Sequence, residues 1–196
     1  MSWLEVIVMA IVQGLPEFIP ISSTAHIRIV PALLKWPDPG AAFTAVIQIG
    51  TLAAVVWYYW RDIIRIATAM LADLRRGKLA TTHDALMGWL IVVGTLPIVV
   101  IGLMFRHQIK SELRSLYVVA SAVGGVAILL AIAELIIRRR EAAGVHGRSI
   151  EEAGWRDATV VGFAQAVALI PGSSRSGSTI LGGLMSGLTR EAAARF

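Results

Sequence analysis

The chain has 196 residues, of which 56% are hydrophobic and 16% charged, and its mean hydropathy is +0.71. Soluble domains carry roughly 25% charged residues, so this composition excludes an ordinary soluble protein and indicates one integral membrane domain over residues 1–196. Cysteine is absent, which excludes disulfides, thiolate catalysis and sulfur-ligated metals. The formal net charge of +5 comes from basic residues beside apolar segments, which indicates membrane orientation and no nucleic-acid partner.

The first predicted element is a re-entrant helical hairpin over residues 3–34. Its two apolar arms are each too short to cross a bilayer, and they flank the polar tract Phe18-Ile19-Pro20-Ile21-Ser22-Ser23-Thr24. Unwound backbone at membrane depth persists only where it is buried in protein or lines a polar cavity. The tract is therefore predicted to be the hairpin tip, with its serine and threonine side chains capping the second arm.

Three membrane spans are predicted next, at residues 41–60, 86–105 and 116–137. The first two contain no charged residue, and the first ends in an aromatic cluster typical of a membrane interface. The third contains only Glu134, which lies one helical turn before Arg138 and is predicted to pair with it.

The connecting segments predict the orientation. Residues 61–85 and 138–157 each contain five basic side chains, whereas residues 106–115 contain three. By the positive-inside rule, the first two segments are cytoplasmic, and residues 35–40 and 106–115 face the periplasm. Three spans lie between the first hairpin and the C-terminal part of the chain. Because three is odd, a second hairpin there would enter the membrane from the side opposite to the first.

A second re-entrant hairpin is predicted over residues 158–188. Its tip, Leu169-Ile170-Pro171-Gly172-Ser173-Ser174-Arg175, repeats the pattern apolar-Ile-Pro-x-Ser-Ser-polar of the first tip. We therefore predict an all-α membrane fold of inverted repeats, with residues 1–137 as the first repeat and residues 155–196 as the start of the second. Residues 189–196 read as a capped helix start with no further span, so the second repeat is expected to be incomplete.

The paired tips predict an anion-binding site near the middle of the membrane. A half-helix N-terminus favours negative charge, and Ser173, Ser174 and Ser176 are placed to cap the second arm. Arg175 adds a planar fork that matches phosphate oxygens, and a charge at this depth is costly without a partner. Helix capping alone would explain either tract by itself, but the duplication and the arginine favour a shared diphosphate site.

The residues suited to catalysis lie in the first hairpin. Glu17 follows Gln13 by four residues, which places both on one side of the first arm if it is helical. A carboxylate in an apolar arm needs a cation or a basic partner, and magnesium bridging Glu17 to phosphate oxygens would supply one. His26 follows Ser23 by three residues, which permits a nucleophile and base arrangement, although a histidine near a serine often serves only packing.

These tracts resemble the two signatures of a known family. The stretches Gln13 to His26 (QGLPEFIPISSTAH) and Pro171 to Thr179 (PGSSRSGST) resemble those of the bacterial undecaprenyl-pyrophosphate phosphatase, or bacitracin-resistance, family. The resemblance covers essentially the whole chain. It implies a multi-pass enzyme of the bacterial inner membrane that hydrolyses undecaprenyl diphosphate to undecaprenyl phosphate and inorganic phosphate. This reaction recycles the lipid carrier of peptidoglycan biosynthesis, at a site expected to open to the periplasm.

The resemblance also implies residue roles. Glu17, assisted by Gln13, would bind a divalent cation, Mg²⁺ or Ca²⁺, together with substrate, and Ser23 and His26 would carry out phosphoryl transfer. Serine attack with histidine as base is our preferred hypothesis, and histidine as the phosphoryl acceptor stays open. The residues implied to hold the diphosphate are Ser22, Thr24, Ser173, Ser174, Arg175, Ser176 and Thr179. Family members continue for some seventy residues beyond the position of Phe196, so the chain is expected to be a truncated form.

Three other functions are alternatives to this one. The other large lipid-phosphatase superfamily needs a histidine six residues after its motif arginine, where this chain has Leu181. A purely structural scaffold would not need buried ionisable groups. A transporter or flippase for an isoprenoid phosphate is the serious alternative, because hairpins alone do not separate binding from hydrolysis. Gly124 and Gly125 would allow close helix packing within or between protomers, so a homodimer stays open.

Overall fold

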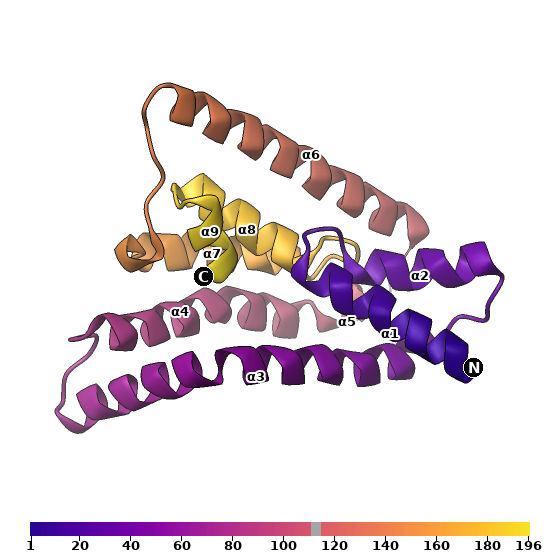
Figure 1. The fold of residues 1–196 in the computed structure, drawn as a ribbon, viewed down its shortest axis with the longest axis horizontal. Helices are drawn as coiled ribbons and strands as arrows, with labels where there is room; N and C mark the ends of the chain where they lie inside the picture. The colour runs from indigo at the N-terminus through magenta and orange to yellow at the C-terminus, as the bar shows by residue number, and fades with distance from the viewer. Residues whose placement is uncertain (111–114) are drawn as a thin grey trace.

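The computed structural model describes residues 1–110 and 115–196, and these residues form helices joined by turns, with no β-strand (Figure 1). The predicted all-α fold is therefore confirmed. Residues 111–114 of the predicted periplasmic segment 106–115 lie outside the described part. The helices are α1 (Trp3–Phe18), α2 (Ser23–Leu34), α3 (Gly40–Arg75), α4 (His83–Met104), α5 (Arg106–Lys110), α6 (Leu116–Ala142), the 3₁₀ turn η2 (Ile150–Glu152), α7 (Trp155–Val167), α8 (Arg175–Ser186) and α9 (Arg190–Arg195).

The N-terminal arm and its return helix form where the first hairpin was predicted. Ser2 and Glu5 make a capping box that starts α1, and the hydroxyl of Ser22 accepts a hydrogen bond from the Ala25 amide to start α2. Between the two helices, Ser22 has a φ of 64°, which is uncommon for a residue with a side chain. The chain reverses here because Pro20 cannot continue α1 and Ser22 takes up this left-handed conformation.

Three helices, α3, α4 and α6, are long and apolar enough to cross a membrane. The span predicted at residues 41–60 lies within α3, and this helix continues beyond it to Arg75. Arg65 lies on this extension, where it pairs with Asp62 one turn away and with Asp84 on α4. These ion pairs let the helix continue beyond its apolar part, so much of the predicted loop 61–85 is helical.

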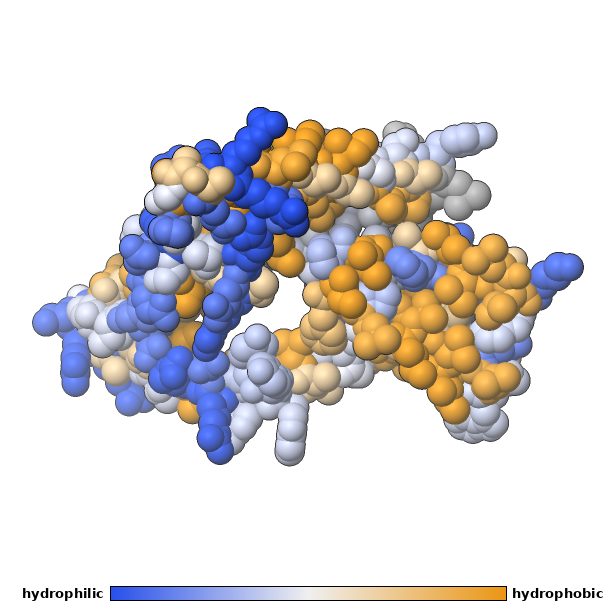
Figure 2. Space-filling model, turned by 45° about the horizontal axis from the view of Figure 1, so that its top comes forward, coloured by the Kyte–Doolittle hydropathy of each residue, from blue (hydrophilic) through white to orange (hydrophobic). Residues whose placement is uncertain are grey.

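The two hairpins enter the molecule from opposite ends, and their tips meet near its middle (Figure 1). The α3–α4 connection and the segment before α7 lie at one end, and the α2–α3 connection lies at the other. Hydrophilic residues gather at the first end, whereas a broad hydrophobic area covers the other half of the face in Figure 2. The basic segments 61–85 and 138–157 thus share one end of the molecule, as their predicted common side requires.

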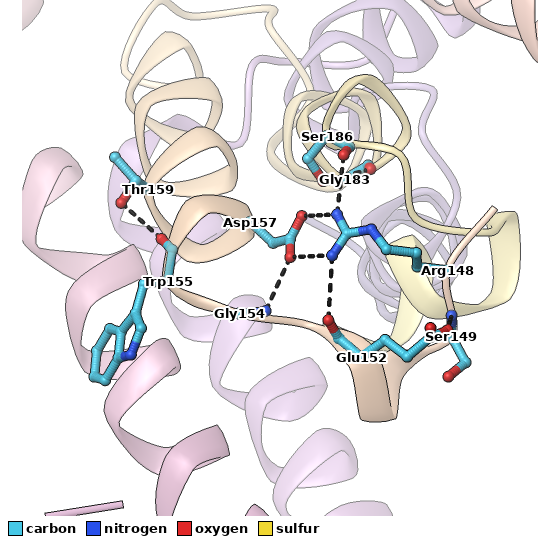
Figure 3. A network of polar contacts seen from close by, with 9 residues as sticks. All are labelled: Arg148, Ser149, Glu152, Gly154, Trp155, Asp157, Thr159, Gly183 and Ser186. Carbon is cyan, nitrogen blue, oxygen red and sulfur yellow. Dashed lines mark hydrogen bonds and ion pairs between the residues drawn. The ribbon is translucent and has the colours of Figure 1, made fainter.

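A partly buried ion pair fixes the second hairpin at its open end (Figure 3). Asp157, at the start of α7, is 1% exposed and accepts hydrogen bonds of 2.5 and 2.9 Å from the guanidinium of Arg148. Arg148 also donates to the carbonyl oxygens of Glu152 and Ser186, so it joins both ends of the hairpin. Burial alone would raise the pKa of Asp157, but the hydrogen bonds from Arg148 and the Gly154 amide outweigh it and hold the pKa below its usual range.

Small residues let the second hairpin pack closely against its neighbours. A Cβ on Gly162 would lie 2.6 Å from the carbonyl oxygen of Gly94, so α7 and α4 cross nearly backbone to backbone. Gly172, with a φ of 99°, sits equally close to the α6 backbone at Val119. The predicted Glu134–Arg138 pair forms at 2.7 Å, and Arg190 joins it from the start of α9. These contacts hold the second tip in place.

Candidate functional site

The two tips enclose a cavity of about 80 Å³ between them, called the tip cavity below. The tips touch directly, because the Ser176 hydroxyl donates a hydrogen bond of 3.3 Å to the carbonyl oxygen of Ile19. Two polar tracts from opposite ends of the sequence therefore form one site. The tip cavity is lined by Pro16, Glu17, Ser22, Ser23 and Thr24 from the first hairpin, by Ala168, Pro171, Gly172, Ser173, Ser174, Arg175 and Ser176 from the second, and by Gln48 from α3.

One serine in each tip caps the following helix. Ser22 accepts from the Ala25 amide at 3.4 Å, and Ser174 accepts from the Gly177 amide at 3.1 Å. The repeat pattern aligns Ser22 with Ser173, but the cap positions show that its structural counterpart is Ser174. The shift arises because the second connection, residues 168–174, is longer than the first, residues 19–22. Both helices direct their N-termini toward the tip cavity, and their free amides and dipoles favour an anion there.

Glu17 is the centre of a hydrogen-bond network in the first tip. Its Oε2 atom accepts from the Ser23 hydroxyl at 2.6 Å and from the Gln13 amide at 3.3 Å. Its Oε1 atom accepts no hydrogen bond within the described part of the chain. Gln13 is 1% exposed and does not line the tip cavity, so its amide orients Glu17 from behind. The predicted neighbours Gln13 and Glu17 are thus brought together on one side of α1.

His26 makes no hydrogen bond to Ser23 among the described residues. Its Nδ1 atom lies 2.9 Å from the carbonyl oxygen of Ser22, and the residue is not part of the lining of the tip cavity. A carbonyl oxygen only accepts, so Nδ1 is the donor in this contact, and in a neutral ring Nε2 is then the acceptor. The serine and histidine contact that the sequence spacing permits is replaced by the contact between Ser23 and Glu17. The reason is that the hairpin turns Glu17 back over the first turn of α2.

Arg175 lies at the junction of two cavities. The residue lines both the tip cavity and an adjoining side cavity of about 310 Å³, and its guanidinium has no ion pair or hydrogen bond among the described residues. Thr179 lines only the side cavity, and its hydroxyl donates back to the carbonyl oxygens of Arg175 and Ser176. The tip region therefore presents one unpaired cation to a bound anion, with Thr179 one helical turn away.

Sequence reasoning missed two residues of α3 at this site. Gln48 lines the tip cavity, and the hydroxyl of Thr51 accepts a hydrogen bond of 3.5 Å from the Gln13 amide. Both lie inside the uncharged stretch that predicted the first span. The available signal was a glutamine in an otherwise apolar span, because polar side chains at membrane depth are costly without a purpose.

Glu17 is the carboxylate in the tip cavity that could bind a metal ion. No group of three histidine, aspartate or glutamate side chains lies close enough together to hold a metal among the described residues. Mg²⁺ is nevertheless commonly bound through one or two carboxylates together with substrate phosphates and water. The free Oε1 atom of Glu17, beside a cavity shaped for an anion, fits that mode of binding.

Comparison with known proteins places this arrangement in a family. The family described as "Bacitracin resistance protein BacA" matches residues 6–196. The chain belongs to that family. It is 56% identical over 196 residues to the undecaprenyl-diphosphatases of Chlorobium phaeovibrioides and of Chlorobaculum tepidum, covering all of this chain and 70% of each relative. It is 52% identical to the undecaprenyl-diphosphatase of Chloroherpeton thalassium, of which it covers 69%. The resemblance of the two signature stretches to the bacitracin resistance family is thereby confirmed.

Proposed function

We propose that the protein hydrolyses undecaprenyl diphosphate to undecaprenyl phosphate and inorganic phosphate. The observation that carries this proposal is the meeting of two helix N-termini and the unpaired Arg175 around one small cavity, with the Glu17–Ser23 pair in its wall. Relatives at 52% to 56% identity bear the name of this activity. The serine hydroxyl beside a carboxylate goes beyond what a simple anion carrier needs, which favours the enzyme over a flippase.

The diphosphate is held between the two tips and attacked from the first. The amides at the start of α2 and α8 and the guanidinium of Arg175 bind the phosphate oxygens, and the same groups meet the charge that develops during transfer. Ser23 lies at the cavity wall, where its oxygen can reach the terminal phosphorus. Ser173, Ser176 and Thr24 add hydroxyl groups around the same anion.

In the proposed reaction, the Ser23 oxygen forms a bond to the terminal phosphorus and Glu17 takes the hydroxyl proton through their existing 2.6 Å hydrogen bond. The bond from that phosphorus to the bridging oxygen breaks, and undecaprenyl phosphate leaves. Water then hydrolyses the phosphoserine and releases inorganic phosphate, and Glu17 returns the proton to Ser23. His26 orients the first turn of α2 through the Ser22 carbonyl oxygen, and its free Nε2 is a proton acceptor for the water step.

A divalent cation, Mg²⁺ in the first instance and Ca²⁺ as the alternative, belongs to this proposal. Glu17 would hold it through Oε1, with Gln13 fixing the carboxylate from behind. When bound, such an ion supplies charge neutralisation for the diphosphate oxygens. The fit rests on the free carboxylate oxygen beside an anion site.

We further propose the bacterial inner membrane as the location, with the site opening to the periplasmic side. The basic segments at one end of the molecule support this orientation by the positive-inside rule. We also propose that the protein forms a homodimer. Added Cβ atoms on Gly124 and Gly125 of α6 would meet no atom within 4 Å, so this face has room for a second helix.

The deciding experiment is phosphate release from a prenyl diphosphate by the purified protein in detergent, with Mg²⁺ and with a chelator. We expect release that the chelator abolishes. Binding of the lipid diphosphate without any phosphate release would support the flippase function and exclude ours. Phosphate release that the chelator does not affect would exclude the role of the cation and leave the proposed hydrolysis standing.

A further inference from the structure

One wall of the tip cavity comes from neither hairpin. Gln48, in the N-terminal third of α3, is the lining residue that lies outside both tips. Its side-chain amide makes no hydrogen bond to the described residues, although its backbone carbonyl oxygen accepts one of 2.9 Å from the Thr51 hydroxyl. A side-chain amide left without a protein partner in a membrane span is costly, so its position needs an explanation.

The face of α3 that carries Gln48 points toward the hairpins. Residues three and seven positions along a helix share one face, and these are Thr51 and Val55. Thr51 contacts Gln13 of α1, and Val55 lines the side cavity. Gln48 therefore shares its face of α3 with residues that contact the site, and it lines the tip cavity although its side chain is exposed.

Hydrogen bonds link the α3 turn that carries Gln48 to Glu17 on α1. The Thr51 hydroxyl donates to the Gln48 carbonyl oxygen and accepts from Gln13, whose amide also donates to Glu17. This series of hydrogen bonds joins α3 to α1 where the Thr51 side chain packs beside Gly14. Gln48 is thereby held beside the same cavity as Glu17 and Ser23.

We propose that Gln48 is a further substrate-binding residue whose side-chain amide donates a hydrogen bond to a phosphate oxygen of the bound diphosphate. The inference rests on the proposed function and extends it, because it adds a third element to the binding site. A neutral amide adds a donor without adding a charge, so it complements Arg175. Its oxygen can accept from a water or a protonated phosphate oxygen at the same time.

The test compares Gln48→Leu and Gln48→Glu with the parent protein, and Gln108→Leu on α5, an exposed glutamine outside the cavity, is the matched control. Binding of methylene diphosphonate, a diphosphate that cannot be hydrolysed, is measured with Mg²⁺ in detergent. Phosphate release from a prenyl diphosphate gives KM and kcat. A hydrogen bond to a charged oxygen corresponds to about a tenfold to hundredfold change in affinity. We expect Gln48→Leu to weaken diphosphonate binding and raise KM by about that factor, with Gln48→Glu weaker still through charge repulsion.

A thermal unfolding scan of each variant separates binding from folding. Leucine suits a membrane helix, so Gln48→Leu should keep the parent melting temperature, and a Gln48→Asn variant that recovers part of the affinity would support the hydrogen bond further. Parent-like binding and KM in a folded Gln48→Leu protein would overturn the inference, as would parent protein that does not bind the diphosphonate. Parent protein that binds the diphosphonate but releases no phosphate would instead exclude the proposed hydrolysis. The Gln48 inference would then be judged on the binding constants alone.

Discussion

The hydroxyl of Ser23 donates a 2.6 Å hydrogen bond to Oε2 of Glu17, although the two residues belong to different helices of the first hairpin. The carboxylate is the nearest proton acceptor to the proposed nucleophile. His26, the base that the sequence spacing favoured, is turned to the Ser22 carbonyl oxygen instead. The pairing changes which substitution should affect the first chemical step.

Glu17→Gln should lower kcat by at least about a hundredfold, because general base catalysis typically contributes two to four orders of magnitude. Phosphate release from a prenyl diphosphate measures it, with Glu191→Gln on α9 as the control. Ser23→Ala should show a similar loss, and the double variant should be little worse than either single one, because the pair acts as a unit. Additive losses would argue against a shared step.

Arg175→Ala should weaken diphosphate binding and also lower kcat, because the guanidinium meets charge in both the ground state and the transition state. Arg175→Lys should recover only part of the loss, since lysine lacks the planar fork. Isothermal titration with methylene diphosphonate and steady-state kinetics separate the two effects. Arg139→Ala, in the last turn of α6, is the matched control and should leave both unchanged.

Asp157→Asn should destabilise the protein by about 2 to 3 kcal/mol at pH 7, less than for a fully buried pair because Arg148 is partly exposed. The folded-state pKa of Asp157 is depressed, so its stabilising contribution is present above the ordinary aspartate pKa of about 3.9 and is lost as pH falls through the folded value. Melting temperatures in detergent should therefore differ between parent and variant at pH 5 to 8, and the difference should shrink as the pH falls below the ordinary aspartate pKa. A gap that persists at low pH would contradict this.

Gly162→Ala should destabilise the packing of α7 on α4, because the added methyl would lie 2.6 Å from the Gly94 carbonyl oxygen. Overpacking of this kind costs about 1 to 3 kcal/mol. Gly50→Ala on α3 adds the same methyl where no atom lies within 4 Å, so it should be neutral or slightly stabilising. Thermal unfolding of the two variants in one detergent makes the comparison, and equal melting temperatures would refute the close crossing.

Cysteine labelling tests the orientation, and the chain has no native cysteine to remove. Lys78, in the α3–α4 connection, and Gln108, on α5, are both exposed. In sealed inside-out vesicles, a membrane-impermeant reagent should label Lys78→Cys and leave Gln108→Cys unlabelled. Labelling of both from one side would contradict the assignment of residues 61–85 to the cytoplasm and 106–115 to the periplasm.

The sequence by itself determined the membrane character, the three spans and the positions of both hairpins. These features depend on local hydrophobicity and on short turn signals, such as Pro20 and Ser22, which act over neighbouring residues. The pairing of the two tips was also predictable, because the repeated tract is present in the chain. The full length of α3 was not, since its extension is stabilised by an ion pair to Asp84, which belongs to the next helix.

Only the tertiary structure decided which side chains meet within the site. Spacing placed His26 one turn from Ser23, but the fold of the hairpin returned Glu17 over that serine and gave it the shorter hydrogen bond. The sequence repeat aligned Ser22 with Ser173, whereas the length of the second connection made Ser174 the cap. Gln48 entered the site because α3 packs across α1. Such contacts depend on how separate helices cross in space, and a linear pattern contains no record of that geometry.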